Sequence, residues 1–173
     1  MAYDILIKSG LILDGTGKEP LFADIGIKDK KIADIGALNP KNVATVIDAQ
    51  GKYVTPGFID ITNHSDTHLT LFKYPQMESL VMQGITTIIG GNCGASLAPL
   101  VSPSAIHAID KWTDASSINI NWNTVEEFLE QIDTMHLGVN FGTLLGYGTL
   151  RRGIINDEIR LLTFDEREKI KYL

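Results

Sequence analysis

The pattern of the sequence changes at Thr55-Pro56-Gly57-Phe58-Ile59-Asp60-Ile61, where a Pro-Gly break leads into a short apolar run. After this stretch, apolar runs of strand length alternate with helical segments, which is typical of parallel βα units. Residues 58–61 are expected to form the first strand. Ile85-Thr86-Thr87-Ile88-Ile89 is expected to form the second, because β-branched residues favour strands. A third predicted strand covers residues 139–145. Residues 56–173 therefore indicate an α/β fold.

Helices are predicted between and after these strands. One is expected at residues 75–83, with a proline in its first turn, and a short one at residues 104–112. A better-defined helix is expected at residues 124–135, because Thr124 and Glu127 have the spacing of a capping box. A second Thr–Glu capping box, at residues 163 and 166, is expected to start a helix that continues to the last residue without a stop signal. We therefore expect the chain to be a fragment.

Residues 1–55 predict a small antiparallel β domain. Residues 24–28 alternate as a half-buried strand does, and residues 4–8 and 11–13 read as strands separated by Ser9-Gly10. Asp14-Gly15-Thr16-Gly17 indicates a turn, because glycine adopts positive φ and aspartate can accept from its own backbone.

The composition argues against several classes of protein. The chain has 173 residues, of which 44% are hydrophobic and 21% are charged, which argues against disorder. A net charge of -6 gives no basic surface for nucleic acid, and no apolar run is long enough to span a membrane. The N-terminus lacks signal-peptide features, so a cytoplasmic location is expected. The single cysteine, Cys93, excludes an intrachain disulfide.

Polar side chains follow each predicted strand. His64 and Asp66 follow the first, Cys93 follows the second, and Tyr147 and Arg151 follow the third. In a βα barrel the catalytic groups lie at these carboxyl ends, and imidazole, thiolate and carboxylate are all zinc ligands. A polar loop with a buried cysteine explains the same residues without a metal. A third interpretation makes Cys93 a nucleophile with His64 as its base.

Several motifs resemble the amidohydrolase superfamily. Residues 56–60 match its P-G-F-I-D entry into the barrel, and His64 matches the second histidine of the x-H-x-H that follows. Residues 91–94 (G-N-C-G) with residues 96–99 (S-L-A-P) resemble the D-aminoacylase branch, whose members are N-acyl-D-amino-acid deacylases. Residues 146–151 resemble its G-H-x-T-L-R segment.

This resemblance implies a fold, a cofactor and site residues. The fold would be a small β domain at residues 1–55, part of a composite β-sandwich, and the first three βα units of a TIM-type (β/α)8 barrel at residues 56–173. Cys93 would be a ligand of a divalent metal such as zinc, and His64 and Asp66 would lie at the same site. Tyr147 or Arg151 would contact the substrate carboxylate, unless Arg151 forms a salt bridge that holds the third loop.

The chain departs from the family pattern at two positions. Thr62 replaces the first barrel histidine, and Tyr147 replaces the histidine of G-H-x-T-L-R. Because threonine is a poor zinc ligand, the departures disfavour a binuclear site. They also leave open a non-catalytic homologue that acts as a binding or assembly protein.

The resemblance places the remaining catalytic groups outside this chain. Three of eight barrel strands are expected here, whereas the later metal histidines and the catalytic aspartate of the family lie on later strands. We therefore expect a hydrolase of N-acyl-D-amino acids whose catalytic residues cannot be named in this chain, and a chain that is inactive alone. The missing strands would come from a second polypeptide, or the fragment would self-associate.

Overall fold

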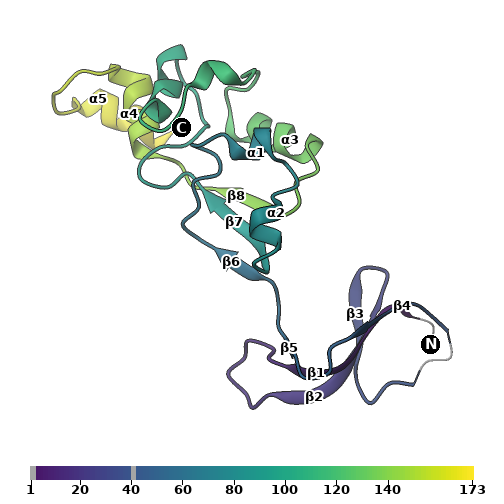
Figure 1. The fold of residues 1–173 in the computed structure, drawn as a ribbon. Coiled ribbons are helices and arrows are strands. Elements are labelled where there is room, and N and C mark those ends of the chain that lie inside the picture. Colours follow the sequence, from purple (N-terminus) through teal and green to yellow (C-terminus); the bar gives the residue numbers. More distant parts are fainter. Residues whose placement is uncertain (1–2, 40–41) are drawn as a thin grey trace. The chain divides into compact units, whose positions relative to one another are not determined.

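The computed structural model describes residues 3–39 and 42–173 (Figure 1). The chain divides into two compact units, residues 1–56 and 57–173, one residue from the domain boundary predicted between residues 55 and 56. Within the described residues, no helix is both long enough and apolar enough to cross a membrane.

The first unit is a five-stranded mixed sheet with β1 at its centre. The strand order is β3-β2-β1-β4, and β5 also pairs with β1. The strands are β1 (Tyr3–Ile12), β2 (Leu21–Lys28), β3 (Lys31–Gly36), β4 (Val43–Asp48) and β5 (Tyr53–Val54).

The prediction of a small antiparallel β domain is confirmed only in part. β2 runs antiparallel to β1, and β3 antiparallel to β2, but β4 and β5 run parallel to β1. The chain leaves β3 at one edge and returns beside β1 on the opposite side. Turn residues and alternation identify strands but do not specify which edge of a sheet a later strand joins, so the sequence could not show this.

Two local predictions in the first unit can be compared with the structure. The expected break at Ser9-Gly10 is an irregularity inside one strand, where Ser9 has φ 58° and the register to β2 shifts. The turn at residues 14–17 is confirmed: Asp14 Oδ1 accepts from the Thr16 amide at 2.9 Å and from its hydroxyl at 2.7 Å.

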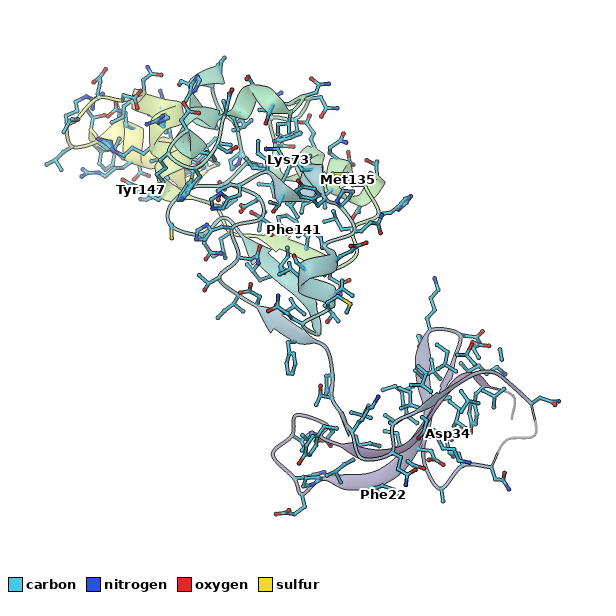
Figure 2. The ribbon with its side chains drawn as sticks, viewed as in Figure 1. Phe22, Asp34, Lys73, Met135, Phe141 and Tyr147 are labelled. Atoms are coloured by element: carbon cyan, nitrogen blue, oxygen red, sulfur yellow. The ribbon has the colours of Figure 1, made fainter. Side chains whose placement is uncertain are left out.

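Many large apolar side chains of the first unit are exposed. A hollow of about 340 Å³ is lined mainly by isoleucines, together with Leu13, Val54 and Pro56. The exposed residues are Leu21, Phe22, Ile32, Ile35, Val46, Ile47 and Tyr53, and Figure 2 labels Phe22 among them. This sheet therefore buries only part of the apolar surface that its sequence provides.

The second unit contains the predicted parallel sheet, in the order β6-β7-β8. Both strand pairs are parallel, which confirms an α/β arrangement. The strands are β6 (Phe58–Asp60), β7 (Ile85–Gly90) and β8 (Asn140–Thr143). β8 is shorter than the predicted 139–145.

The helices of this unit match the prediction unevenly. Thr124 and Thr163 each accept from the backbone of the glutamate three residues later, so both capping boxes are confirmed. The helix predicted at residues 75–83 is present but shorter, because Met77 has φ 49° and the helix begins only after it, at Glu78. The helix predicted at 104–112 is a 3-10 helix. The elements are α1 (Thr70–Lys73), α2 (Glu78–Val81), η1 (Pro103–Ile109), η2 (Ala115–Ser117), α3 (Val125–Thr134), α4 (Tyr147–Ile155) and α5 (Phe164–Lys171).

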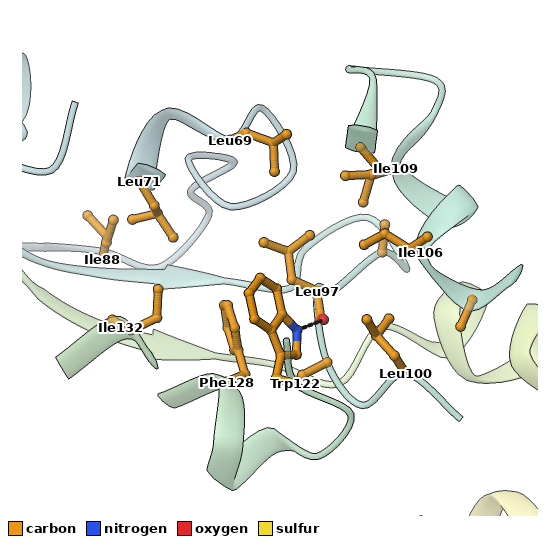
Figure 3. Close-up of a cluster of buried hydrophobic side chains, with 14 of the residues drawn as sticks. Leu69, Leu71, Ile88, Leu97, Leu100, Ile106, Ile109, Trp122, Phe128 and Ile132 are labelled. Atoms are coloured by element: carbon orange, nitrogen blue, oxygen red, sulfur yellow. Dashed lines mark hydrogen bonds between the residues drawn. The ribbon is translucent and has the colours of Figure 1, made fainter. Parts of the chain in front are cut away.

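The core of the second unit lies between the sheet, α3 and the long segment that joins β7 to α3 (Figure 3). Phe128 of α3 is fully buried, and its ring lies 5.2 Å from that of Trp122. The Trp122 Nε1–H donates to the Leu97 carbonyl at 2.7 Å, so this indole is satisfied as well as buried. The hydrogen bond fixes Leu97, four residues after Cys93, against the core.

Candidate metal centre

The loops that follow the three parallel strands are hydrogen-bonded to one another. The Asn63 amide donates to the Ile89 carbonyl at 3.1 Å, and the Leu144 amide donates to the Gly90 carbonyl at 3.0 Å. The Asn92 side chain donates to the carbonyls of Ile89 at 2.8 Å and Asn63 at 3.2 Å. The polar residues predicted after the first two strands are therefore carried by loops that are fixed to each other, and those predicted after the third strand lie in α4.

The structure brings His64 and Cys93 together. Their facing atoms, His64 Nε2 and Cys93 Sγ, are 3.5 Å apart. Cys93 has φ 55° and is exposed, and the adjacent Gly94 also has positive φ, at 76°. Left-handed backbone is uncommon for a side chain such as cysteine and concentrates at functional sites. This tight turn presents the thiol to the imidazole.

The separation of these two atoms suits a shared zinc ion. Zinc binds thiolate sulfur at about 2.3 Å and imidazole nitrogen at about 2.0 Å, so two such atoms on one tetrahedral ion lie about 3.5 Å apart. The separation of His64 Nε2 and Cys93 Sγ therefore matches that of two ligands on one zinc ion. Among residues 3–39 and 42–173, no group of three or more His, Cys, Asp and Glu side chains could hold a metal ion. Further ligands would have to come from elsewhere.

Asp66 joins two of the loops. Its side chain is fully buried, and Oδ2 accepts from the Gly91 amide at 2.6 Å, while the buried Oδ1 has no hydrogen-bond partner. Burial raises the pKa of this carboxyl, and the Gly91 N–H offsets the rise in part. A Cβ at Gly90 would lie 2.7 Å from Oδ2, so the carboxylate fits only against glycine. The structure thus shows a contact that holds the Cys93 loop, and a metal role for Asp66 stays a prediction.

Two residues beside His64 were not identified from the sequence. Thr67 Oγ1 lies 3.4 Å from His64 Nδ1, and the Trp112 ring lies 5.7 Å from the imidazole, tilted by 35°. Lys111 Nζ lies 3.9 Å from the centroid of the Trp112 ring. Thr67 is close in sequence and its spacing could have suggested the contact. Trp112 belongs to the distant β7–α3 segment, and no local pattern points to it.

The third loop is held by Thr149 and Ser96. The Thr149 hydroxyl accepts from the Ser96 amide at 2.9 Å and donates to the Ser96 carbonyl at 3.1 Å. The Ser96 hydroxyl accepts from the Gly146 amide at 3.0 Å. All three residues are buried. These bonds join the two motifs around residues 96 and 149, because each motif supplies hydrogen-bond partners of the other.

Tyr147 and Arg151 occupy different environments. Tyr147 begins α4, and its side chain is exposed (Figure 2). Arg151 Nη2 donates to the carbonyls of Glu158 at 2.8 Å and Arg160 at 2.7 Å. Arg151 thus holds the segment after α4 through carbonyl oxygens, and not through the carboxylate of the salt bridge considered above. Substrate binding by Tyr147 and Arg151 stays a prediction.

A match to a known family model identifies the family of this chain. Residues 45–156 match the model of the Amidohydrolase family. The chain belongs to the amidohydrolase family. This match includes the strand ends that carry His64, Cys93 and Tyr147.

Individual relatives place this amidohydrolase in the D-aminoacylase branch, as the motifs predicted. An uncharacterized protein of Mycobacterium tuberculosis is 36% identical over 90% of the chain. A D-aminoacylase of Alcaligenes xylosoxydans xylosoxydans is 32% identical over 95% of it. The chain covers 27% and 33% of these two relatives, so it spans about a third of their length or less.

Solved structures of this branch have the same fold over nearly the whole chain. The N-acyl-D-glutamate deacylase of Bordetella bronchiseptica, in complex with zinc and a phosphonate inhibitor, aligns with a TM-score of 0.85 and 31% identity over 99% of this chain. A D-aminoacylase described with a binuclear metal centre aligns with a TM-score of 0.81 and 32% identity over 96% of this chain. The chain covers 35% and 34% of those two proteins.

Proposed function

We propose that this chain is the N-terminal segment of a metal-dependent hydrolase that cleaves the acyl-amide bond of small N-acyl-D-amino acids. The observation that carries the proposal is the 3.5 Å separation of His64 Nε2 and Cys93 Sγ at the ends of two adjacent parallel strands. The pair has the chemistry and spacing of zinc ligands in a member of the D-aminoacylase branch.

We also propose that β6, β7 and β8 are the first three strands of a (β/α)8 barrel, and that the first unit is part of a β-sandwich. The parallel order of the strands supports the barrel. Phe58 and Ile59 of β6, and Leu144 after β8, are exposed apolar residues on the two edge strands or next to them. Such edges pair with further strands, supplied by the rest of the protein as a second polypeptide or by self-association.

Each residue of the site has a role that its contacts support. Cys93 and His64 would hold a divalent metal, of which zinc is the proposed example. When bound, such an ion lowers the pKa of its water and polarises the amide carbonyl. Asp66 keeps the Cys93 turn against the first loop through Gly91. The exposed ring of Tyr147 is available to contact the substrate. The base that takes the proton from water is proposed to lie outside this chain.

The same pair of atoms supports a second candidate. A thiol 3.5 Å from an imidazole nitrogen could act as a nucleophile with a general base, which would make the protein a cysteine hydrolase. A third candidate is a non-catalytic homologue used for binding or assembly, which Thr62 and Tyr147 suggest because each replaces a histidine of the family pattern.

Native mass spectrometry and activity measurements separate these candidates. The complete protein should carry metal and hydrolyse N-acyl-D-amino acids, and chelation should abolish the activity. Cys93→Ser and His64→Gln should lose metal, whereas His68→Gln is a matched control, because that ring contacts His64 only edge-on at 6.4 Å. Activity that survives chelation but is lost on alkylation of the thiol would favour the nucleophile. Metal-free protein without hydrolase activity would favour the binding homologue.

The location and partners are also proposed. The proposed location is the cytoplasm. The net charge of -6 agrees with a small-molecule substrate and not with nucleic acid or an anionic membrane as the partner.

A further inference from the structure

The ring of His64 faces a different side chain with each of its nitrogens. Nε2 faces Cys93 Sγ at 3.5 Å, and Nδ1 faces Thr67 Oγ1 at 3.4 Å. Thr67 is fully buried, so its hydroxyl must find its partners within the protein. The same Oγ1 lies 3.3 Å from the His64 carbonyl oxygen.

These contacts favour one placement of the protons. A carbonyl oxygen only accepts, so the single hydroxyl proton of Thr67 is donated to the His64 carbonyl. The lone pairs of Oγ1 are then left for Nδ1, which must carry a proton to make this contact. In a neutral imidazole only one nitrogen is protonated, so Nε2 keeps its lone pair, and Nε2 is the atom that faces Cys93.

The Trp112 ring limits the rotation of the imidazole, and the His68 ring makes only a distant edge contact with it. The Trp112 ring lies 5.7 Å from that of His64 at an angle of 35°, and the His68 ring lies 6.4 Å away, nearly perpendicular. A flip of the His64 ring would put Cε1 where Nε2 faces the thiol and Cδ2 where Nδ1 faces Thr67, so the buried Thr67 hydroxyl would lose its nitrogen partner. The surroundings therefore favour one orientation as well as one tautomer.

We propose that Thr67 is a positioning residue that holds His64 in the Nδ1–H tautomer and so keeps the Nε2 lone pair available to a metal. The metal itself rests on the proposed function, whereas the tautomer is a property of the metal-free protein. Groups of this kind, which accept from the second nitrogen of a histidine ligand, set the orientation and basicity of that ligand.

The direct test is the nitrogen-15 spectrum of the histidine rings in the complete, metal-free protein at about pH 8.5, where imidazole is neutral. His64→Gln identifies the His64 signals by their loss. The expected result is an Nδ1–H tautomer in the unmodified protein and in Thr67→Ser, and a mixture in Thr67→Val. An Nε2–H tautomer in the unmodified protein would overturn the proposal without any variant.

Thr70→Val is the matched control. Its hydroxyl donates to the Ser65 carbonyl at 3.1 Å in the next turn, so the substitution removes a comparable hydrogen bond from the same region. Thr70→Val should leave the tautomer of His64 unchanged. If it changed the tautomer as much as Thr67→Val does, the effect would come from a general loosening of the loop, and the proposal would fail.

Metal affinity gives the second readout. Zinc titrations of the complete protein should show binding about 10- to 100-fold weaker for Thr67→Val, and little change for Thr67→Ser or Thr70→Val. If Thr67→Val changed the tautomer but left the zinc affinity unchanged, Thr67 would still be a residue that positions His64. His64 would then not be a ligand of the proposed metal. Unchanged tautomer and unchanged affinity in Thr67→Val would overturn the inference and leave the proposed hydrolase untouched.

Discussion

The two units of the chain leave different groups without partners. In the first unit the buried carboxylate, Asp24, is fully used: Oδ1 accepts from the Ser9 amide at 2.7 Å and Oδ2 from the Leu38 amide at 3.1 Å. In the second unit the buried carboxylate, Asp66, uses one oxygen only. By contrast, the first unit exposes large apolar side chains, whereas the second buries Trp122 and Phe128 in a packed core.

This difference indicates that the first unit has a structural role and that the second unit carries the chemistry. Buried polar atoms without partners are rare, and each calls for an explanation such as a functional role. Across the described residues the two such side-chain atoms, Asp66 Oδ1 and Arg151 Nη1, both belong to the second unit, which also carries the His64–Cys93 pair. The first unit has satisfied polar groups and an apolar face that another part of a protein could cover.

The largest expected effect compares one substitution in both units. Phe128→Ala should lower the free energy of unfolding by about 3–5 kcal/mol, because it empties a fully buried site. Phe22→Ala should change it by no more than about 0.5 kcal/mol, because that ring is 67% exposed. Urea unfolding of the chain measures both. An equal loss of unfolding free energy in both variants would mean that the face of the sheet around Phe22 is covered.

The second comparison exchanges each buried carboxylate for an amide. Asp24→Asn should cost about 1–3 kcal/mol, because its NH2 group must face one of two backbone N–H donors. Asp66→Asn should cost less, since the amide oxygen can still accept from Gly91 while the NH2 group replaces an atom that had no partner.

Thermal unfolding of the two aspartate variants provides the measurement. The order of their stabilities is the informative result. If Asp66→Asn were the less stable protein, Oδ1 would have a donor that the present contacts do not contain.

The smallest expected effect concerns two surface carboxylates whose pKa values are lowered for different reasons. Hydrogen bonds from Arg160 lower the pKa of Glu166 from 4.5 to about 2, whereas the hydroxyl and amide of Thr16 lower that of Asp14. A carboxyl with a lowered pKa contributes stability that is complete above its ordinary pKa. The Glu166 contribution is therefore present above about pH 4.5 and lost as the pH falls through about 2.

Carboxyl NMR titrations at low and high salt would test this distinction. Salt screens the attraction to the arginine, so the pKa of Glu166 should rise towards its ordinary value, while that of Asp14 should change little. Arg160→Gln should raise the pKa of Glu166 further than salt does. A pKa of Glu166 that is insensitive to both changes would contradict the assigned cause.

Short-range features were predictable from the sequence. The two capping boxes depend on residues three positions apart, and β7 depends on its own β-branched run. The proximity of His64 and Cys93 was predictable too, because the carboxyl ends of neighbouring parallel strands meet at one edge of a sheet.

Long-range features were not predictable. The parallel pairing of β4 with β1 depends on which edge of a sheet the chain returns to, and the contact of Trp112 with His64 joins residues far apart in the chain. The use of Asp66 is a similar case: its sequence position suits a metal ligand, but its Oδ2 contacts a backbone amide 25 residues away. Such contacts depend on tertiary packing, which no local pattern encodes.

The central place of β1 in the first sheet has a consequence for how this unit folds. β1 pairs with β2, the next strand along the chain, but also with β4 and with β5, where Leu11 is paired with Tyr53. The hairpin can form early through a short loop, whereas the parallel pairs require closure of much longer loops, which slows folding. During synthesis on the ribosome, one side of β1 therefore stays an open edge until β4 and β5, within residues 43–54, have been made.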